Sequence, residues 1–202
     1  MRQIVAELAG AGVALLQYRN KQDSDVLVAQ DALAIHAALE AASPGSELPH
    51  PMKLILNDRA ALVVPSAWDG VHLGQDDLAP AEARTILGPR AIVGVSTHTD
   101  EQIRLADCQP VDYIAIGPVF PTISKTDTSP LIGLEGVERA RALTSKPLVA
   151  IGGITLENAA SVYDAGADSL AVISAIFAPG RGAADAVRAF LAILGSDGSA
   201  SR

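Results

Sequence analysis

The stretch KLILNDR, residues 53–59, contains the pattern from which the fold can be predicted. Its apolar run, residues 54–56, is typical of a buried strand and ends abruptly in Asn57, Asp58 and Arg59. Apolar runs that end in polar residues or glycine recur along the chain as GVALLQYRNK, DGVHLGQDD, AIVGVSTH, DYIAIGPVF, KPLVAIGGI and DSLAVISAI. The stretches between them have helical periodicity, and this alternation predicts β/α units with a parallel sheet.

The seven strand–helix units favour an α/β fold of the TIM (β/α)8 barrel class over an open doubly wound sheet. Polar groups follow almost every predicted strand, whereas a doubly wound sheet gathers them at one switch point. Residues 1–9 resemble a helix, so we expect the barrel's first β-strand to be missing at the N-terminus. We expect a single domain over residues 1–194 and a disordered tail over residues 195–202.

Helices are predicted over residues 23–42, 78–87, 99–108, 134–144, 156–165 and 183–194. Thr99 and Thr155 are expected N-caps, because a threonine oxygen can accept a free amide hydrogen of the first turn. The apolar face of the longest helix is predicted to contain Val26, Ala29, Leu33, Ala37 and Ala41.

The composition narrows the function classes. The net charge is −8 and the sequence pI is near 4.9, which argues against nucleic acid as a partner because a phosphate backbone needs a basic surface. No segment has the length of a membrane span, so we expect no membrane association and a cytoplasmic location. Small-molecule substrates are the expected partners, and a homo-oligomer is left open.

The first candidate site is an anion clamp after the first strand. Gln17, Arg19 and Lys21 occupy alternate positions and would point the same way if the chain stayed extended. Two cations and an amide suit a phosphate or pyrophosphate. The alternative is a solvated strand end with surface charges.

The second candidate site is a metal site at the ends of the next two strands. Asn57, Asp58 and Asp77 offer hard oxygen ligands that suit Mg²⁺, which is usually shared with substrate phosphates. The alternatives for Asp58 are a salt bridge to Arg59 or an N-cap of the following helix.

The third candidate site is metal-free and suits a monophosphate. Thr122, Ser124 and Lys125 lie in a long loop that could close over an anion. Near the last two strand ends, the glycines of IGGI (residues 151–154) would let backbone amides approach an anion, beside VIS (residues 172–174).

Acid–base chemistry has only two candidates in the sequence, His72 and His98, and packed or hydrogen-bonded roles are the alternative for both. No nucleophile–base pair is evident. Cleavage of a carbon–pyrophosphate bond needs none, since it requires charge neutralisation and a second substrate nearby. The residues therefore predict a transferase that joins a pyrophosphate ester to a monophosphate acceptor.

The order of the motifs QYRNK, ILNDR, GVHLGQDD, GVSTH, DYIAIGPVFPTISKTD, VAIGGI and GADSLAVISAI resembles the thiamine-phosphate synthase family, from about Gln3 to Phe177. That family joins a pyrimidine pyrophosphate to a thiazole phosphate through a pyrimidine carbocation. Tyr18 and Ser124 depart from the Leu and Thr that are usual in the family.

The resemblance implies a role for each matching residue. Mg²⁺ would bind Asp58 and Asp77, and Lys125 and Ser96 would be catalytic through contacts to the pyrophosphate. The substrate-binding set would comprise Gln17, Arg19, Lys21, Asn57, Ser96, Thr122, Ser124, Lys125, Gly153, Ile173 and Ser174. One alternative is a thiazole tautomerase that uses His98 without a metal. Another is an inactive remnant that only binds ligand.

Overall fold

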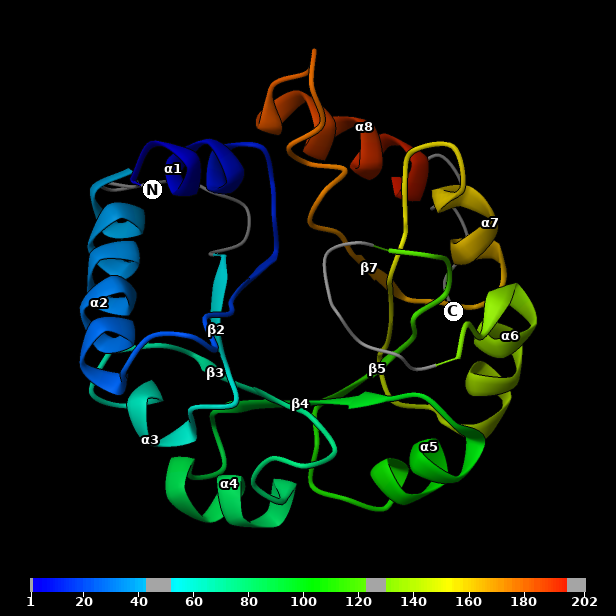
Figure 1. Cartoon of the computed structure of the whole chain (residues 1–202), viewed down its shortest axis with the longest axis horizontal. Helices are drawn as coiled ribbons and strands as arrows, with labels where there is room; N and C mark the ends of the chain where they lie inside the picture. Colours follow the sequence, from blue (N-terminus) through cyan, green and yellow to red (C-terminus); the bar gives the residue numbers. More distant parts are fainter. Residues whose placement is uncertain (1, 43–51, 123–129, 196–202) are drawn as a thin grey trace. The chain divides into compact units, whose positions relative to one another are not determined.

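The computed structural model describes residues 2–42, 52–122 and 130–195. Helices and strands alternate along this part of the chain (Figure 1). The strands are β1 (Leu15–Tyr18), β2 (Lys53–Asn57), β3 (Gly70–Leu73), β4 (Ile92–Thr97), β5 (Tyr113–Ile116), β6 (Leu148–Ile151) and β7 (Ser169–Ala171). All seven predicted strands are confirmed.

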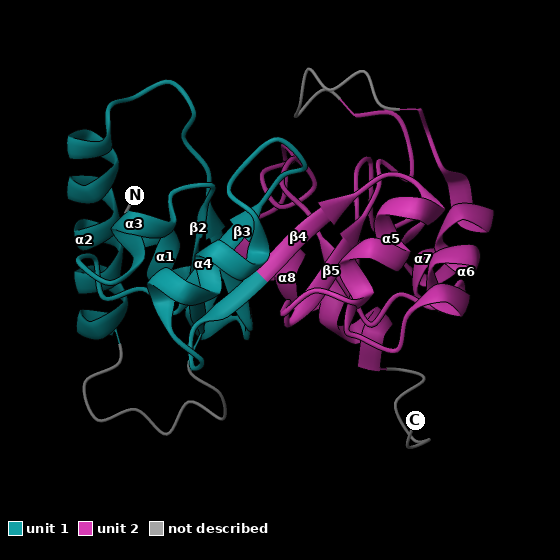
Figure 2. Ribbon diagram, turned by 90° about the horizontal axis from the view of Figure 1, so that it is seen from below, with its two compact units in different colours: residues 1–93 teal, residues 94–202 magenta. Residues whose placement is uncertain are grey.

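The helices are α1 (Arg2–Gly10), α2 (Asp25–Ala42), α3 (Ala60–Val63), α4 (Pro80–Leu87), α5 (Asp100–Asp107), α6 (Gly133–Leu143), α7 (Ala159–Asp164) and α8 (Ala183–Gly195). The chain divides into two compact units, residues 1–93 and residues 94–202, shown in different colours in Figure 2. The strand order follows the sequence, β1 to β7, and β4 runs from the first unit into the second. The expectation of a single domain stays a prediction.

In the first unit, β1, β2 and β3 pair in parallel, with Leu16 opposite Leu54 and Leu56 opposite Val71. The residues of β2 are buried from Leu54 to Leu56, as the apolar run predicted. Asp69 accepts hydrogen bonds from the Leu54 amide and from Lys53 Nζ, both at 2.9 Å. Asp69 therefore joins the amino ends of neighbouring strands, away from the polar residues at their carboxyl ends.

In the second unit, β4 to β7 pair in parallel around an aliphatic core, with Ile114, Ile116 and Leu148 fully buried. Asp168 accepts a hydrogen bond from the Leu148 amide at 2.8 Å and forms an ion pair with Arg141 at 2.6 Å. The amino end of this sheet is thus held by the same kind of aspartate as in the first unit.

Helix α2 corrects one prediction. Its buried residues are Val28, Ala32, Ile35 and Ala38, whereas Val26 is 66% exposed and Leu33 is 50% exposed. The predicted apolar face was therefore the wrong one. Apolar residues lie all round this helix, so periodicity alone could not decide which face packs.

Helix boundaries give a mixed result. The Thr99 N-cap is confirmed, because its hydroxyl accepts the Gln102 amide at 3.2 Å. The Thr155 N-cap is wrong: a turn precedes α7, which begins at Ala159, and the Thr155 amide donates to Asn158 Oδ1 at 2.8 Å. Gly195 ends α8, and the rest of the predicted tail lies outside the described residues.

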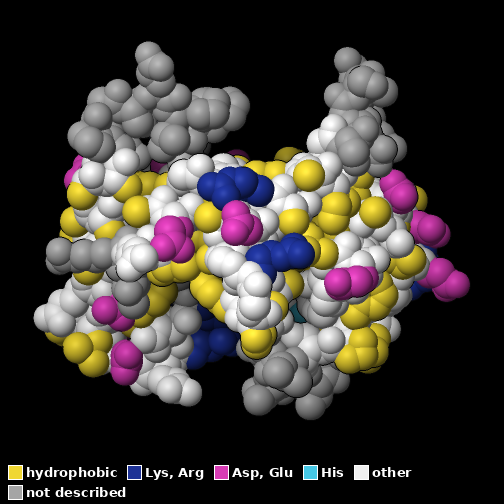
Figure 3. Space-filling view, turned by 90° about the horizontal axis from the view of Figure 1, so that it is seen from above, with side chains coloured by type: hydrophobic (Ala, Val, Ile, Leu, Met, Phe, Trp, Pro, Cys, Tyr) yellow, Lys and Arg dark blue, Asp and Glu magenta, His cyan; other side chains and the backbone are white. Residues whose placement is uncertain are grey.

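The described helices contain no segment long and apolar enough to cross a membrane. On the face shown in Figure 3, acidic and basic side chains are interspersed among apolar ones. The described residues visible there form no continuous basic surface of the kind that a nucleic-acid backbone requires.

Candidate functional site

Asp58 lies directly after β2 and forms an ion pair with Lys21. The Lys21 ammonium is 2.9 Å from Asp58 Oδ2, and the two side chains are 51% and 20% exposed. Asp58 adopts φ +64°, a left-handed conformation that is uncommon outside glycine. Its amide donates to the His72 carbonyl at 2.8 Å, which anchors the residue to the end of the adjacent strand.

Both alternatives for Asp58 are wrong. Its ion-pair partner is Lys21, whereas Arg59 pairs with Asp25. Arg59 is the N-cap residue of the short helix α3, and no side chain forms a capping hydrogen bond there. The sequence suggested neither of the observed partners, because Lys21 and Asp25 lie far from residues 58–59 along the chain.

Asp77 belongs to the same cluster in the first unit. Its Oδ2 accepts the Gly74 amide at 2.7 Å, and a Cβ on Gly74 would lie 2.7 Å from that oxygen. Burial raises the pKa of Asp77, and so do a hydrogen bond and charge repulsion from the Asp58 carboxyl. The Gly74 amide and the Lys21 ammonium oppose this rise. A cation bound next to these two groups would favour the ionised form of Asp77.

Asp58 and Asp77 could hold a magnesium ion, which needs fewer protein ligands than a fully protein-bound metal does. The described residues contain no group of three or more His, Cys, Asp or Glu side chains that could hold a metal. Magnesium is usually held by one or two carboxylates together with substrate phosphates and water. Asp58 and Asp77 fit that pattern, with Asn57 half-buried beside them at the end of β2.

The other two clamp residues lie within β1 and just after it. Gln17 is half-buried within the strand, and Arg19 is exposed on the loop after it. The chain does not stay extended as far as Lys21, because β1 ends at Tyr18. Asn20 Oδ1 then accepts hydrogen bonds from the amides of Gln22 and Asp23, each at 3.1 Å. Lys21 therefore meets Asp58 from a turn rather than from an extended strand.

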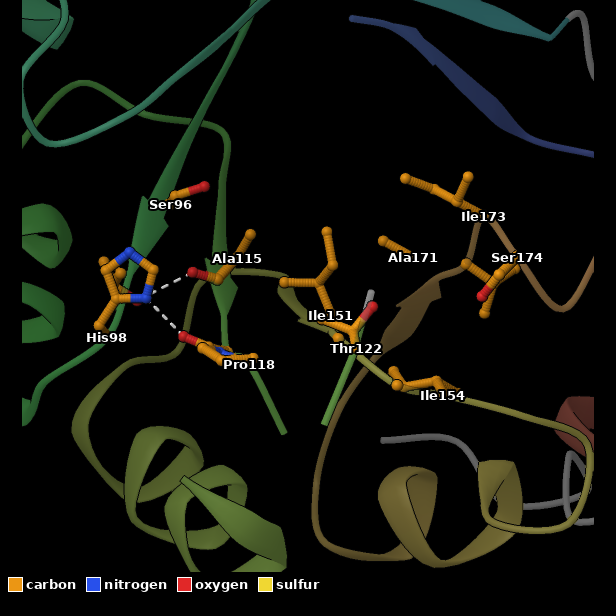
Figure 4. A pocket seen from close by; sticks show the side chains of 15 residues that line it. Ser96, His98, Ala115, Pro118, Thr122, Ile151, Ile154, Ala171, Ile173 and Ser174 are labelled. Carbon is orange, nitrogen blue, oxygen red and sulfur yellow. Dashed lines mark hydrogen bonds between the residues drawn. The ribbon is translucent and has the colours of Figure 1, made fainter. Parts of the chain in front are cut away.

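The second unit contains a pocket that brings together five of the predicted residues (Figure 4). They come from three strand ends and one loop: Ser96 on β4, Thr122 after β5, Gly153 after β6, and Ile173 and Ser174 after β7. Apolar walls come from Ala115, Ile151 and Ala171. The pocket thus combines hydroxyl groups with an apolar lining, which suits a small ligand with a ring and an anionic group.

The glycine pair gives this pocket its shape. Gly152 and Gly153 have φ of +102° and +63°, and a Cβ on Gly153 would lie 2.5 Å from the Pro121 carbonyl oxygen. The amides of Val119 and Phe120 donate to the carbonyls of Ile151 and Gly152, both at 3.0 Å. The glycines therefore allow the segment before Thr122 to pack closely against the end of β6. Anion approach, the predicted reason for them, stays a prediction.

The two histidines differ in position. His98 lines the pocket, and its Nδ1 lies 2.5 Å from the Gly117 carbonyl oxygen. Because a carbonyl only accepts, Nδ1 donates to it, and in the neutral imidazole Nε2 would have the lone pair. His72 is buried within β3. Ser124 and Lys125 lie outside the described residues.

The fold and these two sets of side chains are typical of an α/β enzyme whose site lies at the carboxyl ends of its strands. Comparison with known proteins then gives the family. The family model described as thiamine monophosphate synthase matches residues 1–176. The chain belongs to this family. Its members are transferases of thiamine biosynthesis. The resemblance seen in the sequence is thereby confirmed.

Individual relatives agree. The chain is 53% identical to a thiamine-phosphate synthase of Koribacter versatilis over 83% of this chain and 75% of that protein. It is 40% identical to a thiamine-phosphate synthase of Albidiferax ferrireducens over 88% of this chain and 78% of that protein. A solved thiamine phosphate pyrophosphorylase from Pyrococcus furiosus is 27% identical, with a TM-score of 0.82 over 96% of this chain and 89% of that one. The TIM-barrel-like fold class is thereby confirmed.

Proposed function

We propose that this chain transfers a pyrimidinylmethyl group from its pyrophosphate to the ring nitrogen of a thiazole phosphate, giving thiamine phosphate and pyrophosphate. The observation that supports this best is the cluster of Lys21, Asp58 and Asp77, which suits a metal-bound pyrophosphate. Membership in the thiamine-phosphate synthase family supports small-molecule substrates, and the two named here are those that the family resemblance implies.

The reaction needs little covalent chemistry from the protein. The carbon–oxygen bond to the pyrophosphate breaks and both electrons leave with the pyrophosphate. The thiazole nitrogen then donates its lone pair to the pyrimidinylmethyl cation. Bond cleavage is favoured by positive charge around the leaving group, and we assign that task to Lys21 and Arg19. Gln17 and Asn57 would orient the same substrate through their amides.

Asp58 and Asp77 would hold Mg²⁺. When bound, the ion would supply neutralising charge to the leaving pyrophosphate. Burial and the neighbouring Asp58 carboxyl raise the pKa of Asp77, and a bound cation would offset both effects.

The acceptor would bind in the pocket of the second unit. The hydroxyls of Ser96, Thr122 and Ser174 can hydrogen-bond an anionic group, and Ile151 and Ile173 can contact a ring. The catalytic roles of Ser96 and Lys125, and the binding roles of Ser124, Gly153 and Ile173, remain part of this proposal.

A metal-independent thiazole tautomerase is a second candidate, favoured by His98. This side chain lines the pocket with its Nδ1 proton fixed on Gly117, so Nε2 could accept a proton. Such a reaction would leave the Lys21–Asp58–Asp77 cluster without a task, which is why we favour the transferase.

The test is a direct assay of thiamine phosphate formation from the two substrates with Mg²⁺, with and without EDTA. We expect metal-dependent product that is lost in Asp58→Ala. Folded protein that makes no product would contradict the transferase, and thiazole isomerisation unaffected by EDTA would support the tautomerase. Binding of thiazole phosphate without turnover would support the inactive remnant. The cytoplasmic location and a homo-oligomer stay part of the proposal.

A further inference from the structure

Arg59 holds the loop that contains Lys21, although it lies after a different strand. Its guanidinium pairs with the Asp25 carboxylate and donates to two backbone carbonyls, of Asn20 at 3.1 Å and of Asp23 at 2.9 Å. All three partners belong to residues 20–25. The planar guanidinium presents several donors in a fixed geometry, so one side chain can hold one loop at three points.

Arg59 also follows Asp58 directly in the sequence. Asp58 pairs with the side chain of Lys21 at 2.9 Å, while Arg59 holds the backbone on both sides of Lys21. Two consecutive residues at the end of β2 therefore act on the same loop. One of them is a predicted metal ligand, and the other holds the backbone from which the predicted pyrophosphate cation extends.

A second anchor limits the movement of the loop from the side of β1. The Asn20 side-chain amide donates to the Tyr18 hydroxyl at 3.2 Å and to Asp23 Oδ2 at 2.7 Å. Tyr18 in turn donates to Asp31 on helix α2. The two anchors both hold Asn20 and Asp23, and Arg59 also holds Asp25 at the start of α2.

The contacts of Arg59 differ in strength. Asp25 is 68% exposed, so its ion pair contributes little in water. The Arg59 side chain is only 23% exposed, and its bonds to the two carbonyls are charge-assisted. Lys21 is 51% exposed and has a long flexible stem, so its ion pair with Asp58 would order the loop poorly without Arg59.

We propose that Arg59 is a positioning residue for the metal–pyrophosphate site, one that acts through the loop backbone to hold Lys21 against Asp58. This inference rests on the proposed function, because the metal–pyrophosphate site is part of that proposal. Arg59 itself lies outside the predicted binding set. It implies that loss of Arg59 weakens pyrophosphate binding and leaves the acceptor pocket unchanged.

The experiment compares Arg59→Ala and Arg59→Lys with a matched control, Arg141→Ala. Arg141 is 25% exposed and likewise pairs with an aspartate, Asp168, while donating to the carbonyls of Thr144 and Lys146. It lies in the second unit before β6, at the amino end of the strands. Any general cost of removing a largely buried arginine should therefore appear in both alanine variants.

The first readout is the thermal shift produced by MgCl₂ with inorganic pyrophosphate. The second is KM for each substrate. We expect Arg59→Ala to lose the shift and to raise KM for the pyrimidine pyrophosphate about 10- to 100-fold, with KM for the thiazole phosphate unchanged. Arg59→Lys keeps the positive charge but loses the planar guanidinium with its several donors. We therefore expect it to recover only part of the thermal shift and of the wild-type KM. Arg141→Ala should lower Tm but retain the full shift.

Each outcome separates the two proposals. If the wild-type chain shows neither a shift with magnesium pyrophosphate nor turnover, the proposed function fails. If the wild type responds and Arg59→Lys responds equally, with an unchanged KM, the positioning role is overturned even when Arg59→Ala does not fold. An equal rise of KM for both substrates in Arg59→Lys would also overturn it.

Discussion

The ammonium of Lys21 lies 2.9 Å from the Asp58 carboxylate, and this ion pair joins the loop after β1 to the end of β2. Burial raises the pKa of Asp77, which lies in the loop after β3, and the Asp58 carboxyl raises it further. A cation, a carboxylate and a second carboxyl group are thus brought into one cluster from three successive strand ends. The consequences can be measured residue by residue.

Replacement of Lys21 should impair catalysis with little effect on folding. Because the ammonium is half-exposed, its ion pair adds little stability, but it would neutralise charge on the leaving pyrophosphate. We expect Lys21→Ala to lower kcat/KM by about 10²-fold, measured by steady-state assay of thiamine phosphate.

Lys53→Ala is the matched control for that variant. Lys53 forms an ion pair of the same length, 2.9 Å, with Asp69 and is 46% exposed, but it lies at the amino end of β2. We expect its kcat/KM to stay within about twofold of the wild type. Equal losses in both variants would contradict a specific role for Lys21.

Asp77→Asn should stabilise the metal-free protein at neutral pH. The pKa of Asp77 is raised from 3.8 in the folded state, so its contribution to stability is present below that value and is lost as pH rises through the folded-state pKa. An asparagine at position 77 does not ionise, so the variant avoids this loss of stability. Its side-chain oxygen can still accept the hydrogen bond from the Gly74 backbone amide.

The measurement is Tm of both proteins from pH 4 to pH 8, with EDTA and with MgCl₂ plus pyrophosphate. A gain of 1 kcal/mol would raise Tm by about 2–4 °C in a chain of this size. We expect Asp77→Asn to be the more stable protein at pH 7 in EDTA and to lose the shift on addition of magnesium pyrophosphate. A lower Tm at pH 7 in EDTA would contradict the charge repulsion.

Gly153→Ala should damage the acceptor pocket. A Cβ there would meet the Pro121 carbonyl at 2.5 Å, and the backbone φ of +63° disfavours any side chain. We expect a loss of about 1–3 kcal/mol of unfolding free energy and a raised KM for thiazole phosphate, measured by denaturant unfolding and steady-state kinetics.

Gly88→Ala separates the two causes. Gly88 has φ +78°, but a Cβ added there would meet no atom within 4 Å, so this variant has the backbone cost without the clash. Its KM for thiazole phosphate should equal that of the wild type. A normal KM in Gly153→Ala as well would show that close packing at β6 does not shape the pocket.

Tyr18→Phe tests the residue that departs from the family's usual leucine. The variant keeps the edge-on ring contact with Trp68 but removes the hydroxyl between Asp31 and Asn20. We expect a loss of about 1–2 kcal/mol in unfolding free energy at pH 7, measured in urea.

The pH dependence provides the check on that variant. Burial and the Asp31 carboxylate raise the pKa of Tyr18 above 10.0. Its stabilisation is therefore present below pH 10 and is lost as pH rises through the folded-state pKa. The difference between wild type and Tyr18→Phe should shrink in strong alkali, and a constant difference would contradict this assignment.

The sequence by itself determined the strands, their order and every described helix except the short α3. Short aliphatic runs such as residues 54–56 predict buried strands because they are too short for helices and end in polar residues, and their alternation with helices indicates a parallel sheet. Strand ends in such a sheet share one edge, so Asp58 and Asp77 could be assigned to one site from their positions in the chain. Motif order identified the family in the same way.

Tertiary structure decided which partners meet. Helix α2 is apolar all round, so only packing could select Val28 over Val26 for burial. Asp58 had an adjacent cation in Arg59, yet it pairs with Lys21 because the turn at Asn20 brings that ammonium to it. Likewise, the close approach of the Pro121 carbonyl to Gly153 is set by packing between two segments and adds to the cost of a side chain there. These choices depend on distances between segments far apart in sequence, which no local pattern encodes.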